Sequence, residues 1–184
     1  MEKAIKLLVW GLLFLLIDIR IITFDLIHDA IGYILLYRGL KQLPQSKWLA
    51  YAKASAVILG VLSLTEIFGF SNINLDGLNQ DFTWKVPAIG LLSILSLFFH
   101  MNVLSSVMTL TESEEILSST KKFQQFYLIV NLITILSLPA ILVFREMAVL
   151  YLIILILTGL IVEIIYIVKI NSFKRVPTTE DLAS

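Results

Sequence analysis

The chain has 184 residues, of which 58% are hydrophobic and only 15% charged, and its mean hydropathy is +0.91. Soluble domains carry about 25% charged residues, so this composition predicts an integral membrane protein whose first partner is the lipid bilayer. The net charge of zero, without a basic patch outside the expected loops, argues against nucleic acid as a ligand, and the absence of cysteine excludes disulfides, thiolate chemistry and cysteine-bound metals.

Six apolar stretches could cross a bilayer as helices. They cover residues 4–23, 26–40, 48–70, 84–110, 123–144 and 147–170. The first two are expected to be short, because their apolar parts fall below the roughly 20 residues that a full span needs. The first stretch is not expected to be a cleaved signal peptide, since Asp18 and Arg20 follow it where small residues would be required. The sequence therefore predicts an all-α, polytopic transmembrane bundle of about six helices.

The basic residues indicate how this bundle is oriented. With both termini in the cytoplasm, that side collects eleven of the 14 Lys and Arg residues, and the outer side holds only Arg20, Lys85 and Arg145. We therefore expect a multi-pass protein of the cell membrane with both termini cytoplasmic. Residues 1–170 would form one domain, and residues 171–184 a mobile polar tail.

Small residues recur on the third predicted span. Ala52, Ala56 and Gly60 are four residues apart, and they lie on one face of a helix. Small side chains let helices approach closely in lipid, so this face is expected to pack inside the bundle.

The N-terminal third resembles known proteins. Residues 10–20 read Trp-Gly-Leu-Leu-Phe-Leu-Leu-Ile-Asp-Ile-Arg, and residues 24–35 read Phe-Asp-Leu-Ile-His-Asp-Ala-Ile-Gly-Tyr-Ile-Leu. These segments resemble a large set of small, uncharacterised multi-span membrane proteins of Gram-positive bacteria, in which a segment like Ile-Asp-Ile-Leu-Pro-Asp-Phe-Ile-Gly-Tyr-Ile lies at the same place. The resemblance implies five signature positions, Asp18, Asp25, Asp29, Gly32 and Tyr33. The chain has Ile27-His28 where those proteins have Leu-Pro, and the resemblance implies no activity.

A polar stripe runs along the second predicted span. Asp25, Asp29 and Tyr33 are spaced four residues apart and share a helix face. The stripe is interpreted either as helix capping with hydrogen bonds inside the bundle or as a cation or proton site that opens to the outside. In the second interpretation Asp18 and His28 are further ligands. A single histidine without metal-ligand spacing predicts no metal site.

Arg20 is expected to pair on the outer side of the membrane. Asp18 and Arg20 are two residues apart and cannot face the same side of a continuous helix. Glu66, near the outer end of the third span, is the predicted partner of Arg20.

A second polar cluster is predicted deeper in the bundle. His100 and Glu163 both lie about 24 Å from the outer ends of their spans, and Asn131 lies about 12 Å from the inner end of its own. An acidic side chain in the middle of a span needs a polar partner, so His100 and Glu163 should face one another or share a cavity with Asn131. Such a cluster either holds helices together or serves translocation or sensing.

The function is the least determined part of the sequence. It has no nucleotide-binding motif, nucleophile elbow or catalytic constellation, so no enzyme activity and no cofactor are predicted. The expected role is that of an envelope accessory, sensory or partner-binding component, with another membrane protein or a second copy as the partner. The alternative is a small ion- or proton-coupled transporter or channel that uses buried carboxylates. A wet cavity lined by the ionisable groups would favour transport, and a dry, packed bundle would favour the accessory role.

Overall fold

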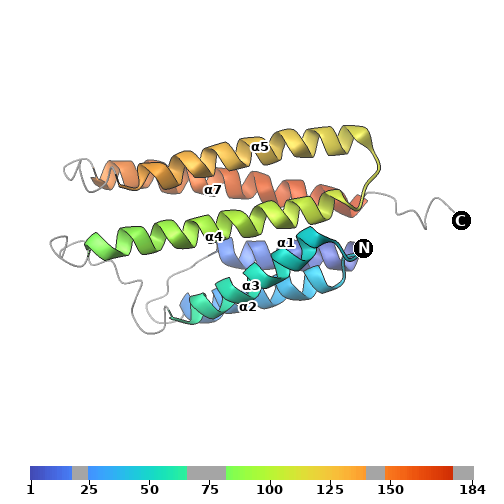
Figure 1. The fold of residues 1–184 in the computed structure, drawn as a ribbon, viewed down its shortest axis with the longest axis horizontal. Helices are drawn as coiled ribbons and strands as arrows, with labels where there is room; N and C mark the ends of the chain where they lie inside the picture. Colours follow the sequence, from blue (N-terminus) through green and yellow to red (C-terminus); the bar gives the residue numbers. More distant parts are fainter. Residues whose placement is uncertain (18–24, 66–81, 140–147, 176–184) are drawn as a thin grey trace, which may run out of the picture.

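The computed structural model describes residues 1–17, 25–65, 82–139 and 148–175 (Figure 1). These residues form six α-helices and no strand, which confirms the all-α prediction for the described part of the chain. The helices are α1 (Glu2–Leu16), α2 (Asp25–Lys41), α3 (Lys47–Thr65), α4 (Phe82–Met108), α5 (Glu114–Ser137) and α7 (Ala148–Ser172), and the 3-10 turn η4 (Phe173–Arg175) follows α7.

Three of the six helices are long and apolar enough to cross a membrane. The qualifying segments are Lys47–Leu64 in α3, Pro87–Met108 in α4 and Ile153–Ser172 in α7. The helices α1 and α2 have 15 and 17 residues and are short, as predicted. The described part of α5 has 24 residues but contains Lys121, Lys122 and two glutamines in its first half, which lower its hydropathy.

The helices run alternately up and down (Figure 1). Each packs against its neighbour in the chain, and α7 also packs against α1. In Figure 1, α4 lies between the group of α1, α2 and α3 on one side and the pair of α5 and α7 on the other.

The first residues and η4 lie at the same end of the bundle. The carboxylate of Glu2 forms an ion pair with Lys6 at 2.9 Å and another with Lys174 at 3.4 Å. Lys6 and Lys174 together hold the pKa of Glu2 below its usual value. Phe173, the residue before Lys174, is fully buried. The chain is therefore held in place through η4. The predicted tail began at residue 171, and its residues 176–184 lie outside the described part.

Glycines allow α1 and α2 to touch through their backbones. A Cβ atom on Gly11 would lie 2.8 Å from the carbonyl oxygen of Gly32, and one on Gly39 would lie 3.0 Å from the carbonyl oxygen of Ala4. Ala4 and Gly11 are seven residues apart, as are Gly32 and Gly39. The two helices therefore cross antiparallel with small residues matched at two successive levels.

The small-residue face predicted on α3 is also a packing face. Ala52 and Ala56 are buried, and a Cβ atom on Gly60 would lie 3.1 Å from Cβ of Tyr33 on α2. This contact confirms that the face points into the bundle, where it packs against α2.

Helix α5 differs most from its predicted bounds. It begins at Glu114 rather than Phe123, so most of the predicted 111–122 loop is helical. Glu114 and Glu115 occupy the first turn, where negative charge is favoured by the helix dipole. The helix ends at Ser137 rather than at residue 144, because Pro139 cannot donate a backbone hydrogen bond and its ring crowds the preceding turn.

Two other helix ends were predicted incorrectly. Helix α1 ends at Leu16 rather than at residue 23, and Ile17 has left the helical conformation with φ −88° and ψ 50°. Helix α7 continues two residues beyond 170 and passes into η4.

The glycine crossing predicts an asymmetric response to alanine substitution. Gly11→Ala should lower the free energy of unfolding by about 1–3 kcal/mol, because the new methyl group meets backbone atoms that cannot move aside. Gly159→Ala is the matched control, since nothing lies within 4 Å of its Cβ position, and it should leave stability unchanged or slightly raised. The measurement is unfolding of the purified chain in detergent, followed by circular dichroism. Equal stability of the two variants would rule out the close crossing.

Candidate functional site

Helices α4, α5 and α7 bring four polar side chains together inside the bundle. His100 comes from α4, Tyr127 from α5, and Glu163 and Tyr166 from α7. Glu163 and Tyr166 are three residues apart, so they project from one face of α7. His100 is only 6% exposed and Tyr166 only 1%, while the Glu163 side chain keeps 23% of its surface exposed.

The predicted contact between His100 and Glu163 is present. Nε2 of His100 lies 3.0 Å from Oε1 of Glu163, as expected from the matched depths of the two residues. The hydroxyl of Tyr127 donates to the other carboxylate oxygen, Oε2, at 3.0 Å. The hydroxyl of Tyr166 donates to the backbone carbonyl of His100 at 2.8 Å. The acid is therefore held between an imidazole and a phenol from two other helices.

The hydrogen bonds restrict where the protons lie. Nδ1 of His100 is 2.7 Å from the carbonyl oxygen of Ser96, and a carbonyl can only accept, so Nδ1 carries a proton. If neither Nε2 nor Oε1 carried a proton, their lone pairs would repel one another. If both carried one, the two hydrogens would clash. The pair therefore holds one proton, as imidazolium with carboxylate or as imidazole with carboxylic acid. In either form its net charge is zero, which is the least costly arrangement for ionisable groups in an apolar bundle.

The contact between Nε2 and Oε1 is close but poorly directed. The two atoms are within ion-pair distance. However, Nε2 forms no hydrogen bond of good geometry with any described residue. The attraction here is thus mainly electrostatic.

Aromatic rings surround the pair. The His100 ring meets the ring of Tyr166 edge-on at 4.9 Å and that of Phe99 at 5.2 Å, and it lies 5.7 Å from the Tyr127 ring. Phe123 packs against both tyrosines, at 6.0 and 6.3 Å. The pair is thus embedded in a packed aromatic cluster.

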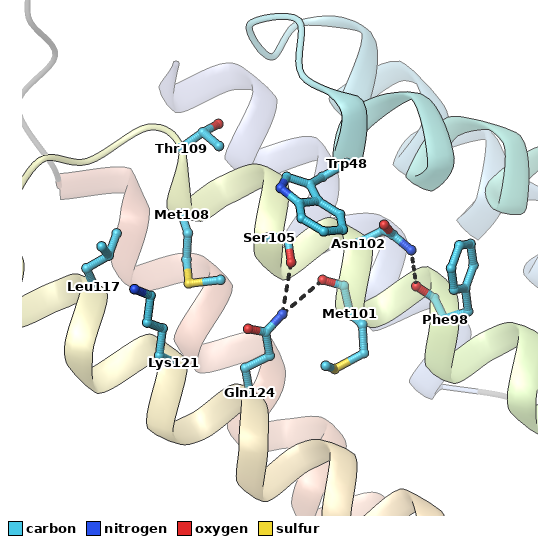
Figure 2. A pocket seen from close by; sticks show the side chains of 10 residues that line it. All are labelled: Trp48, Phe98, Met101, Asn102, Ser105, Met108, Thr109, Leu117, Lys121 and Gln124. Carbon is cyan, nitrogen blue, oxygen red and sulfur yellow. Dashed lines mark hydrogen bonds between the residues drawn. The ribbon is translucent and has the colours of Figure 1, made fainter.

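A hollow of about 600 Å³ lies nearby, between α3, α4 and α5 (Figure 2). Its lining includes Asn102, Ser105 and Gln124, but neither His100 nor Glu163. The ionisable pair and the hollow are therefore separate features of the described structure.

The other predicted site residues lie elsewhere or outside the described part. Asn131 donates its side-chain amide to the Tyr127 carbonyl at 2.9 Å and forms no hydrogen bond with His100 or Glu163 in the described structure. Tyr33 points toward α4, where its ring is 6.3 Å from that of Phe99, and Asp29 is half-buried on the same helix. Asp18, Arg20, Glu66 and the side chains of Asp25 and His28 lie outside the described residues. The Arg20–Glu66 pair and the ion site on the polar stripe thus stay predictions.

Sequence reasoning missed Tyr127 and Tyr166. Both are largely apolar side chains with one polar atom, so they do not stand out in a hydrophobic stretch. Their positions carry a signal nevertheless: Tyr166 follows Glu163 by three residues and Tyr127 precedes Asn131 by four, so each tyrosine lies about one turn from a predicted site residue on the same helix face. Among the described side chains, no group of three His, Asp or Glu residues is close enough to hold a metal ion.

The chain matches no protein-family model, no curated protein and no solved structure. Its function is therefore argued from the geometry alone.

The proton arrangement predicts that Glu163→Gln is tolerated. The amide oxygen can accept from Tyr127, and the amide NH₂ can donate to Nε2 of a neutral His100, so we expect a loss in stability of less than about 1 kcal/mol. Tyr127→Phe should cost about 1–3 kcal/mol, because it leaves a buried carboxylate oxygen without its donor. Chemical unfolding in detergent compares the two variants. A larger loss for Glu163→Gln than for Tyr127→Phe would contradict the assignment.

Proposed function

We propose that the chain is a six-span protein of the cell membrane with both termini cytoplasmic, and that it serves as a non-enzymatic accessory, sensory or partner-binding component. Its partner would be another membrane protein or a second copy of the chain.

Three features support the membrane topology. Large apolar side chains are exposed on every described helix, including Leu91 (72%) and Leu136 (77%), an arrangement that suits lipid and not water. The first residues, the turn between α2 and α3, the turn between α4 and α5, and η4 all lie at one end of the bundle (Figure 1). Most Lys and Arg residues belong to this end, in agreement with a cytoplasmic location.

The observation that favours the accessory role is that His100 and Glu163 contact one another within an aromatic cluster and do not line the hollow described above. A transport site must exchange its ion or proton with water, and a carboxylate used for this purpose is expected to line a cavity. Glu163 instead bonds to His100 and Tyr127 within an aromatic cluster, and the hollow of the described structure is lined by other residues. The pair thus fits a role in joining α4, α5 and α7.

The second candidate is a small ion- or proton-coupled transporter or channel. It is favoured by Asp29, a half-buried carboxylate in the second turn of α2, which lies one turn from Tyr33 on the same helix. This candidate would use the polar stripe rather than the His100–Glu163 pair.

A flux assay distinguishes the two candidates. The purified chain is reconstituted into vesicles that contain a pH-sensitive dye, and a pH gradient is imposed with and without a membrane potential. We expect proton movement no faster than in protein-free vesicles, and no difference between the natural chain and Glu163→Gln. Flux above the protein-free level would favour the transporter, and its loss in Glu163→Gln or in Asp29→Asn would show which carboxylate carries it.

A further inference from the structure

We propose that the hollow between α3, α4 and α5 binds an anionic phospholipid of the surrounding bilayer, with the phosphate beside Lys121 and one acyl chain extending toward Phe98. The proposal rests on the membrane location argued above.

The hollow has the length of a lipid chain segment. Helices α3 and α5 both pack against α4, and the hollow lies between them along the final turns of α4 (Figure 2). Its lining on α4 extends from Phe98 to Met108, a rise of about 15 Å at 1.5 Å per residue, and Thr109 follows directly after the helix. Elongation along the helix axis suits an extended chain that enters from one end.

The walls of the hollow are mostly apolar and adaptable. Five of its ten lining residues are large apolar side chains, namely Trp48 from α3, Phe98, Met101 and Met108 from α4, and Leu117 from α5. Phe98 is 48% exposed and Trp48 is 38% exposed, so the protein leaves part of each ring uncovered. Methionine side chains are flexible and fill irregular spaces, which suits contact with a mobile acyl chain.

Two polar groups of the hollow, the hydroxyl of Ser105 and the ammonium of Lys121, have donor hydrogens that no described residue accepts. Gln124 donates to the Ser105 hydroxyl at 2.9 Å and to the Met101 carbonyl at 3.3 Å. Ser105 accepts this bond, so its own hydroxyl hydrogen stays available, and no described residue takes it. The ammonium group of Lys121 forms no hydrogen bond or ion pair with any described residue. Figure 2 shows Lys121 and Gln124 projecting from α5 toward Met108 and Ser105 of α4.

The charge of the hollow suits an anion. None of the described lining residues is acidic, and Lys121 is its one charged side chain. A second cation lies close by, because the Lys47 ammonium is 4.7 Å from the centre of the Trp48 ring. Basic pockets between transmembrane helices on the cytoplasmic side are known to bind anionic lipid headgroups.

The position of these groups along the bundle matches the two ends of a phospholipid. Trp48 lies in the first turn of α3, Met108 ends α4, and Lys121 lies in the second or third turn of α5, so the polar part lies at the end that carries most basic residues. Tryptophan and lysine are typical of the level of the headgroups. Phe98 lies near the middle of the Pro87–Met108 span, at the level of the acyl chains.

Quenching of Trp48 fluorescence by brominated lipids tests the proposal. The chain has three tryptophans, and Trp10→Phe with Trp84→Phe leaves Trp48 as the sole fluorophore. This variant is reconstituted into vesicles with increasing fractions of brominated phosphatidylglycerol or brominated phosphatidylcholine. We expect the anionic lipid to bind at least about fivefold more tightly than the zwitterionic one, the preference that one lysine at the membrane surface supplies.

Lys121→Gln and Lys122→Gln form a matched pair. Both remove one positive charge from neighbouring positions of α5, but only Lys121 lines the hollow. Lys121→Gln should remove the preference for the anionic lipid, and Lys122→Gln should keep it within about twofold. Equal quenching by the two lipids in the parent variant, or equal effects of the two substitutions, would overturn the proposal. So would a change in oligomeric state caused by Lys121→Gln in size-exclusion chromatography with light scattering, since it would indicate a second copy as the occupant.

Resistance of the chain to alkaline extraction separates this proposal from the membrane location. A chain that is extracted from vesicles contradicts both. A chain that stays inserted but shows no lipid preference contradicts only the binding site.

Discussion

The contact between His100 and Glu163 is the constraint on which the arrangement of α4, α5 and α7 depends. A charged side chain in the middle of a transmembrane helix costs about 2.5–3.5 kcal/mol. Here Glu163 avoids much of that cost because its carboxylate lies 3.0 Å from an imidazole nitrogen of α4 and accepts a hydrogen bond from a phenol of α5. Rotation of any of the three helices would separate these partners. The pair therefore fixes the rotation of each helix about its axis.

Polar contacts add to apolar packing in α5, because many of its large apolar side chains are exposed. Five of its large apolar residues are exposed, namely Phe126, Ile129, Leu132, Ile133 and Leu136. In lipid there is no hydrophobic force to bury them. Helix α5 also bonds to its neighbours: Tyr127 donates to Glu163, and Gln124 donates to Ser105 at 2.9 Å. Ser119 accepts a hydrogen bond from Lys169 of α7 at 2.8 Å. Helices α1 and α2 associate differently, through close backbone contact at Gly11 and Gly32.

The features that the sequence predicts are those that depend only on the order of residues along each helix. Hydropathy predicts the helices, and depth along each span predicts that His100 meets Glu163, because both follow from a rise of about 1.5 Å per residue. The matched glycines of α1 and α2 are visible in the sequence only when the two helices are aligned antiparallel. The start of α5 at Glu114 was missed because a polar amphipathic helix resembles a loop in hydropathy. The roles of Tyr127 and Tyr166 depend on helix rotation, which depth alone does not determine.

A double-mutant cycle on the pair tests the account most directly. His100→Leu, Glu163→Leu and the double variant are compared with the natural chain by chemical unfolding in detergent. Each single variant leaves one ionisable group without its partner and should lose about 2–4 kcal/mol, whereas the double variant leaves none and should be at least as stable as either single variant. Losses that simply add would contradict the account, because they would mean that His100 and Glu163 act independently of one another.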